Sequence, residues 1–177
     1  MPREYSLEFH VDNVPPVMRR KRHVLLVLKD QEGKYVLGGK NEYPKGIVRF
    51  IGGGIHAGED PARGAVRELE EELRIVVPSD KLEHLATIQT TVQTERETLS
   101  FTVYLFFLAL TDQELHPSDD VDTIARLDQH ELNTLISNFY HLPTDLVHKR
   151  PDEESFRWST YGELFGKIHE IGRDLSQ

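Results

Sequence analysis

The stretch "GGGIHAGEDPARGAVRELEEELR", residues Gly52 to Arg74, decides how this sequence is interpreted. It opens on three consecutive glycines, and it then places four glutamates within five positions: Glu68, Glu70, Glu71 and Glu72. Like charges one helical turn apart repel each other by about 0.2–0.5 kcal/mol per pair. The C-terminal end of a helix disfavours anions as well. A carboxylate cluster with these costs indicates that a cation binds there.

Helical periodicity divides this stretch into two faces. Glu59 and Asp60 can cap a helix, and Pro61 suits its first turn. At about 100° per residue, one face is small and apolar, and it consists of Ala62, Ala65, Val66, Leu69 and Leu73. Three of the four glutamates fall on the opposite side: Glu68, Glu71 and Glu72. We therefore expect these carboxylates to converge away from the core, while Glu70 points elsewhere.

Three oxygen donors on one helix face suit a hard divalent cation such as Mg²⁺ or Mn²⁺. Arg67 stands beside them and can hold one carboxylate in place. The glycines of residues 52–54 let the backbone approach a ligand closely, and Gly58 allows a tight turn before the helix. Strand, loop and helix together predict a cradle for a metal ion and a diphosphate.

Composition limits the classes of protein that fit the rest of the chain. The 177 residues are 38% hydrophobic and contain no cysteine, so we expect a single globular domain over residues 1–177 without disulfides or thiolate metal sites. The longest apolar run, Phe101 to Leu110, is too short to span a bilayer, and no signal peptide is evident. A net charge of −9 disfavours general nucleic-acid binding. These features favour a cytoplasmic protein with no membrane partner.

Strand and helix signals alternate along the chain, which predicts an α/β fold. Expected strands are Val24–Leu28, Tyr35–Leu37 and Ile47–Ile51, and a hairpin is expected from Leu85–Val92 and Leu99–Leu110 with its tip at residues 94–97. Residues 1–18 look mixed, and Pro15-Pro16 is expected to stop any regular element. Asp128 can cap a helix that carries Leu132, Leu135 and Ile136, and a last helix carries Leu164, Phe165, Ile168 and Ile171.

The segment from Gly53 to Ile75 resembles the box of the Nudix hydrolase family, G-x5-E-x7-R-E-U-x-E-E-x-G-U, in which U is aliphatic. Every fixed position of that box is met except one, where Arg74 replaces glycine. Glycine there would end the helix in a left-handed conformation. We therefore expect a different helix exit in this chain. The resemblance implies the α/β/α sandwich of that family, with a mixed sheet.

The resemblance also implies an activity, the metal-dependent hydrolysis of a nucleoside diphosphate linked to another moiety. Carried over by position, the metal ligands are the Gly52 carbonyl and the carboxylates of Glu68, Glu71 and Glu72. Arg67 and Glu59 would support them. Glu68 is favoured as the general base, and the alternatives in a downstream acidic loop are Glu114, Asp119, Asp120 and Asp122. The cofactor expected is Mg²⁺ or Mn²⁺.

Substrate choice is left open, because residues outside the box determine it in this family. Phosphates could be contacted by Lys40, Lys45, Arg49 and the glycines Gly53 and Gly54. Tyr43 or Phe50 is either a stacking partner for a base or part of the packing, and packing is favoured for Phe50. The basic run Arg19–Arg22 is either a solvent-exposed segment that leads into a strand, a group that helps to bind an anionic substrate, or part of a subunit contact. A homodimer is therefore possible. Two other functions also stay open, an inactive nucleotide sensor and an RNA-end or cap pyrophosphohydrolase.

Overall fold

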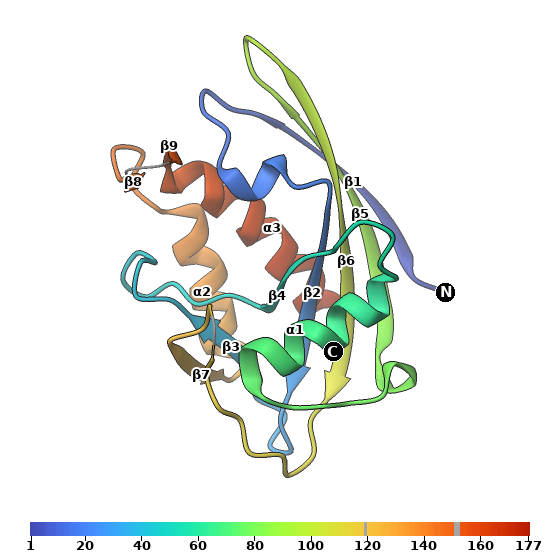
Figure 1. Cartoon of the computed structure of the whole chain (residues 1–177). Coiled ribbons are helices and arrows are strands. Elements are labelled where there is room, and N and C mark those ends of the chain that lie inside the picture. Colours follow the sequence, from blue (N-terminus) through green and yellow to red (C-terminus); the bar gives the residue numbers. More distant parts are fainter. Residues whose placement is uncertain (119, 151–152) are drawn as a thin grey trace.

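A mixed β-sheet forms the centre of the computed structural model, which describes residues 1–118, 120–150 and 153–177 (Figure 1). Seven strands of the described chain belong to it, in the order β1-β5-β6-β2-β3-β7, with β4 paired to β2 beside β3. Their bounds are β1 Arg3–His10, β2 Arg22–Lys29, β3 Tyr35–Gly39, β4 Ile51–Gly54, β5 Glu83–Gln93, β6 Thr98–Ala109 and β7 Thr123–Leu127. A separate two-stranded sheet pairs β8 (Val147–Arg150) with β9 (Glu153–Arg157).

Helices cover both faces of the central sheet (Figure 1). Helix α1 (Pro61–Leu73) packs on one face, while α2 (Gln129–Tyr140) and α3 (Trp158–Leu175) pack on the other. Short 3-10 helices lie at Pro16–Arg19 (η1) and Ser79–Lys81 (η2). The side chains of β2 alternate accordingly, since Leu26 packs toward α1 and Leu25 toward α2 and α3. The predicted α/β/α sandwich with a mixed sheet is confirmed.

Strand β2 organises the sheet around the glycine segment. One edge of β2 pairs with β6 in parallel over its whole length. The other edge is shared, because Leu26 to His23 pair with β4 while Leu28 and Lys29 pair with β3. The glycines of β4 are therefore held against a fully buried central strand, a few residues before α1 begins.

Several predicted elements are confirmed by the structure. The long hairpin forms as β5 and β6, and Thr94 hydrogen-bonds Glu97 across its tip. Asp128 caps α2 in a complete capping box with Glu131. Helix α3 buries Leu164, Phe165 and Ile168 as expected.

Other predictions were wrong. The strand expected at Ile47–Ile51 begins only at Ile51 and runs through the three glycines, because pairing with β2 overrides the low strand propensity of glycine. Residues 1–18 contain β1, which pairs in parallel with β5, and Pro16 begins η1 rather than stopping regular structure. The short strands β7, β8 and β9 were not predicted. Within the described residues, no helix combines the length and the apolarity needed to cross a bilayer.

Candidate active site

Strand β4 brings its glycines into direct contact with the glutamates of α1. Gly52 has φ +139°, and a side chain there would overlap the carbonyl oxygen of Val24 in the neighbouring strand. A Cβ on Gly53 would lie only 2.8 Å from the carboxylate oxygens of Glu68. Gly52 therefore requires glycine, since any side chain there would separate β4 from its partner strand, whereas a side chain at residue 53 would displace the carboxylate of Glu68.

Arg67 connects the loop before α1 to two carboxylates of the helix. Its Nε donates to Glu59 Oε1 at 3.0 Å, and its NH1 donates to Glu68 Oε1 at 2.8 Å and to Glu71 Oε2 at 2.9 Å. Its NH2 donates to the carbonyl of Gly54 at 2.8 Å. The hydrogen bonds from Arg67 lower the pKa of Glu59 to about 2. The predicted supporting roles of Arg67 and Glu59 are consistent with this network.

Two of the three expected ligand carboxylates are buried. Glu68 and Glu72 are 7% and 5% exposed, and Glu72 Oε2 accepts a hydrogen bond of 3.0 Å from the backbone N–H of Gly52. Burial raises the pKa of Glu68, and burial raises the pKa of Glu72 to about 7. These carboxylates line the cavity and lie away from the core that Leu69 and Leu73 enter, as predicted, but β4 covers this side of the helix and buries two of them. Glu71 is more exposed and pairs with Arg67.

The donor chemistry of this corner fits a hard divalent cation. Carboxylate oxygens from Glu68, Glu71 and Glu72 lie next to the strand that carries the Gly52 carbonyl, and such oxygen donors are the ligands that Mg²⁺ and Mn²⁺ prefer. Arg67 now occupies Glu68 and Glu71, and the described residues contain no group of three acidic or histidine side chains arranged to hold a metal. Arg67 bonds one oxygen of Glu68 and one of Glu71, and the Gly52 N–H bonds one of Glu72, so the second oxygen of each carboxylate could serve a cation.

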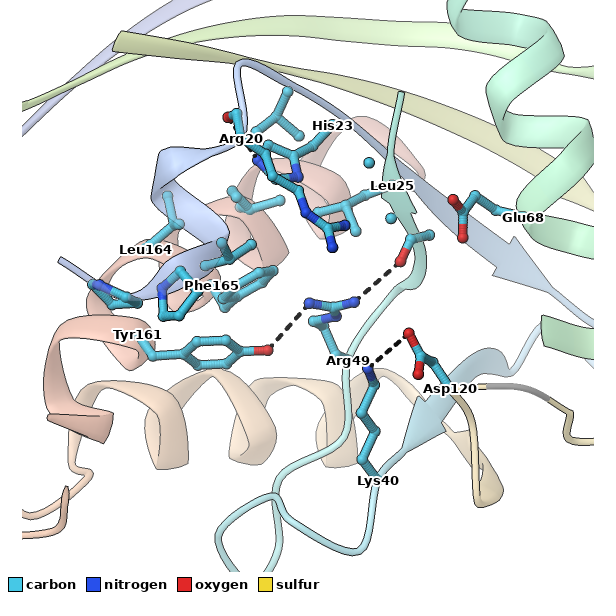
Figure 2. Close-up of a pocket in the computed structure, with 18 of the residues that line it drawn as sticks. Arg20, His23, Leu25, Lys40, Arg49, Glu68, Asp120, Tyr161, Leu164 and Phe165 are labelled. Carbon is cyan, nitrogen blue, oxygen red and sulfur yellow. Dashed lines mark hydrogen bonds and ion pairs between the residues drawn. The ribbon is translucent and has the colours of Figure 1, made fainter. Parts of the chain in front are cut away.

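A cavity of about 580 Å³ opens in front of these glycines and carboxylates. Basic side chains from three other segments line it, namely Arg20 after η1, Lys40 after β3 and Arg49 before β4 (Figure 2). Arg20 lies against Gly54, where a Cβ would meet its NH1 at 2.9 Å. Lys45, which was predicted to bind substrate, is exposed and does not line the cavity. Of the basic run at residues 19–22, Arg20 is the residue placed to meet an anion.

Arg49 lies at the centre of the cavity wall (Figure 2). Its NH1 donates to the Tyr161 hydroxyl at 3.2 Å, and its NH2 donates to the Gly52 carbonyl at 3.1 Å. The guanidinium also lies 4.9 Å from the centre of the Phe165 ring. The carbonyl expected to bind metal is therefore an acceptor for Arg49, and a carbonyl oxygen has a second lone pair for a further partner.

The candidates for the general base are separated by their positions. Glu68 lines the cavity, and so does Asp120, which lies 3.5 Å from Lys40 Nζ (Figure 2). Glu114 and Asp122 do not line it, and Asp122 accepts a hydrogen bond from the Asn41 backbone instead. Asp119 lies outside the described residues. The geometry leaves Glu68 and Asp120 as candidates within the described residues.

The ends of α1 differ in part from expectation. Asp60 alone is the N-cap, since its carboxylate accepts from Ala62 and Arg63 N–H, while Glu59 is used by Arg67 and His56. Arg74 adopts the left-handed conformation with φ 61° that glycine would normally supply, so the expected different helix exit was wrong. The N–H of Ile75 donates to Leu69 O and completes the usual hydrogen-bond pattern of this exit.

Aromatic side chains from β9, α3 and the loop after β3 form another wall of the cavity. Tyr43, Phe156, Trp158, Tyr161 and Phe165 all line it. Trp158 and Tyr161 meet edge to face with ring centres 5.0 Å apart, and Tyr43 lies 6.1 Å from both. Sequence reasoning assigned no role to the residues of β9 and α3 in this wall. Their only signal was a concentration of aromatic residues around residue 158.

Two buried histidines were also missed. His169 on α3 accepts from the Phe50 N–H at 3.0 Å through Nε2, and its Nδ1 lies 2.6 Å from the Phe165 carbonyl, so Nδ1 carries the proton. Its ring stacks on Phe50 at 4.0 Å, which confirms that Phe50 packs in the core. His23 lines the cavity and bonds the Arg20 carbonyl. His169 thereby ties α3 to the segment that leads into β4.

Comparisons with known proteins agree with this arrangement. The family model described as NUDIX domain matches residues 19–148. Similar solved structures include a MutT protein from Bacillus halodurans, with 20% identity, a TM-score of 0.54 and coverage of 65% of this chain and 72% of that chain. The Escherichia coli dihydroneopterin triphosphate pyrophosphohydrolase is 18% identical, with a TM-score of 0.52 and coverage of 67% of this chain and 86% of that chain. The NUDIX domain of Shewanella oneidensis NrtR in complex with ADP ribose is also 18% identical, with a TM-score of 0.52 and coverage of 69% of this chain and 82% of that chain. No curated protein matches the chain.

Proposed function

This chain belongs to the Nudix family of pyrophosphohydrolases, which act on phosphoric anhydride bonds, and we propose that it hydrolyses a nucleoside diphosphate linked to a second group, with a divalent cation as cofactor. The observation that carries the proposal is the contact between the glycine strand and the Arg67 network, at one cavity with Arg20 and Lys40. An anionic substrate would offset the positive charges of Arg20 and Lys40, and a cation that bridges the substrate to α1 would offset the negative charges of the carboxylates.

The roles of the protein groups follow from their contacts. Arg67 holds Glu68 and Glu71 on the cavity side of α1, and the Gly52 N–H fixes Glu72. Arg20 and Lys40 enter from other segments and would contact phosphate oxygens. Glu68, Glu71, Glu72 and the Gly52 carbonyl would hold the cation, which would polarise the phosphoryl oxygens and lower the pKa of a bound water. Glu68 is buried beside this point, and its raised pKa suits a residue that accepts a proton.

A hydrolysis screen with matched variants tests the proposal. Purified protein is incubated with nucleotides, nucleotide sugars, dinucleoside polyphosphates and capped RNA, in Mg²⁺, in Mn²⁺ and in EDTA. We expect metal-dependent cleavage of at least one small nucleotide, and loss of at least 100-fold in Glu72→Gln. Glu70→Gln is the control, since Glu70 is an exposed neighbour on another face of α1. Near-native rates in Glu72→Gln at saturating metal would contradict the assignment.

The same screen separates the other functions. Cleavage confined to capped RNA would indicate an RNA-end enzyme, and tight nucleotide binding without cleavage would indicate a sensor. The general base is tested by rates and metal titrations of two variants, Glu68→Gln and Asp120→Asn. General-base catalysis contributes about 10²–10⁴-fold. We expect that loss in Glu68→Gln and nearly unchanged turnover in Asp120→Asn. The reverse result would place the base in the loop after β6.

A further inference from the structure

Arg49 carries a charge for which the described residues supply no ion-pair partner. It is largely enclosed between β4 and α3, yet no carboxylate of the described chain lies within the 4 Å of an ion pair. Burial alone lowers the pKa of Arg49, but Tyr161, Tyr43 and Glu72 raise it above its ordinary value, so the guanidinium stays charged. An enclosed charge without a carboxylate partner indicates that a ligand completes its bonding.

The guanidinium has donors left for that ligand. It carries five N–H groups in a fixed plane. One is given to the Tyr161 hydroxyl and one to the Gly52 carbonyl, and no other described residue accepts from it. Tyr161, Gly52 and the Phe165 ring hold the plane from three sides. The remaining N–H groups therefore form a pre-oriented set of donors on the cavity wall (Figure 2).

The surroundings of Arg49 are suited to a flat ring rather than to a phosphate. The aromatic side chains of Tyr43, Trp158 and Tyr161 form the neighbouring wall. Aromatic faces are worth about 1–3 kcal/mol for each base that stacks on them. Arg20 and Arg67 both lie against Gly54, and Lys40 lies beside Asp120, so cations other than Arg49 are available to the diphosphate at the end of the cavity where the glycines lie.

We propose that Arg49 is the specificity-determining residue of this cavity and that it recognises the O6 and N7 acceptors of a 6-oxopurine, guanine or hypoxanthine, while the aromatic wall receives the ring. Arginine pairs with two adjacent acceptors through two parallel N–H bonds, and O6 with N7 is the purine edge of that kind. Adenine presents an amino group at the same position, which would place donor against donor. The inference rests on the proposed function for the location of the diphosphate.

Binding of nucleoside diphosphates tests this inference without requiring turnover. Trp158 is the only tryptophan of the chain and lies in the cavity wall, so its fluorescence reports on ligands there. The probes are GDP, IDP, ADP, 7-deaza-GDP and inorganic diphosphate. We expect GDP and IDP to bind about 5- to 100-fold more tightly than ADP, the range of one bidentate contact. We also expect 7-deaza-GDP and diphosphate to bind more weakly than GDP.

Variants add a second comparison. Arg49→Gln should bring GDP and ADP to similar affinity or favour ADP, because glutamine pairs with the N6 and N7 of adenine. Arg96→Gln is the control, since Arg96 is exposed at the tip of the β5–β6 hairpin and should leave the preference for GDP unchanged. Where Arg49→Gln does not fold, as judged by circular dichroism, the series of ligands on the unaltered protein decides.

The outcomes for this inference and for the proposed function are distinct. Equal affinity for GDP and ADP, or diphosphate binding as tight as GDP, would overturn the role of Arg49 even where nucleotides are hydrolysed. A preference for GDP that depends on Arg49, found without hydrolysis of any nucleotide, would support the inference and refute the proposed activity.

Discussion

His169 should make the folded state sensitive to mild acid. Its ring lies between Phe50, Phe139 and Phe165, and both ring nitrogens are already used in hydrogen bonds. Burial lowers the pKa of His169 from 6.5 to about 3. Protonation at Nε2 would replace the acceptor of the Phe50 N–H by a second donor, which the native packing does not accommodate.

The sign and size of the effect follow from linkage. Between pH 6.5 and pH 3 the unfolded chain binds a proton at this histidine and the native state does not, so stability rises with pH. Each pH unit within that window changes the free energy of unfolding by about 1.4 kcal/mol per histidine. Lowering the pH from 7 to 5 should therefore remove about 2 kcal/mol through His169. His23, whose pKa burial lowers to about 4, should remove a similar amount.

Urea unfolding at pH 5, 6, 7 and 8 measures this dependence. His169→Gln keeps a donor and an acceptor but does not titrate, so its loss of stability between pH 7 and pH 5 should be about 2 kcal/mol smaller than that of the unaltered protein. His130→Gln, at an exposed position of α2, should retain the full loss. An identical pH dependence in His169→Gln and the unaltered protein would refute this reasoning.

Three further predictions concern the active-site strand and helix. Gly52→Ala should lower the free energy of unfolding by more than about 3 kcal/mol or prevent folding, because its Cβ would overlap the Val24 carbonyl. Gly58→Ala, at a position with φ +75° and open space around it, should lower the free energy of unfolding by only about 1–2 kcal/mol, as measured by chemical denaturation. Arg74→Gly should raise the melting temperature by about 2–4 °C, because relief of the left-handed conformation outweighs loss of the exposed hydrogen bond to Ser118; a lower melting temperature would contradict this. Mg²⁺ at 100 times its dissociation constant should stabilise the protein by about 2.7 kcal/mol relative to EDTA, and equal melting curves would count against the site.

Local signals in the sequence were sufficient for the elements that local interactions determine. Helix α1 follows from Asp60, Pro61 and the apolar stripe, and α2 follows from its capping box. Strand β1 is different, because it is fixed by pairing with β5, about 80 residues away, although its half-buried Tyr5, Leu7 and Phe9 do alternate with polar residues. Strand β4 is the clearest case, since three glycines form a strand only where a neighbouring backbone must approach closely.

The candidate site divides in the same way. Its carboxylates and Arg67 lie within one continuous stretch and could be predicted as a pattern, but the burial of Glu68 and Glu72 depends on the position of β4, which the pattern does not contain. The contacts of Arg49 with Tyr161 and Phe165 join residues more than 100 positions apart. Such contacts depend on the packing of α3, and no local spacing indicates them. The single domain and the homodimer stay predictions.

Two segments that lie far apart in the sequence form the two halves of the cavity, and this has a consequence for engineering the protein. The half made of β4 and α1 lies inside the matched family region, while β9 and α3 lie beyond residue 148. Residues on the cavity side of α3 can therefore be varied in a library of variants without altering any carboxylate of α1. His169 sets the boundary of such a library, because it is the point where α3 holds the chain that enters β4. Exchanging Trp158 and Leu164 would redirect ligand choice on an unchanged reaction centre, provided that His169 is kept together with Tyr161, whose hydroxyl holds Arg49 beside the Gly52 carbonyl.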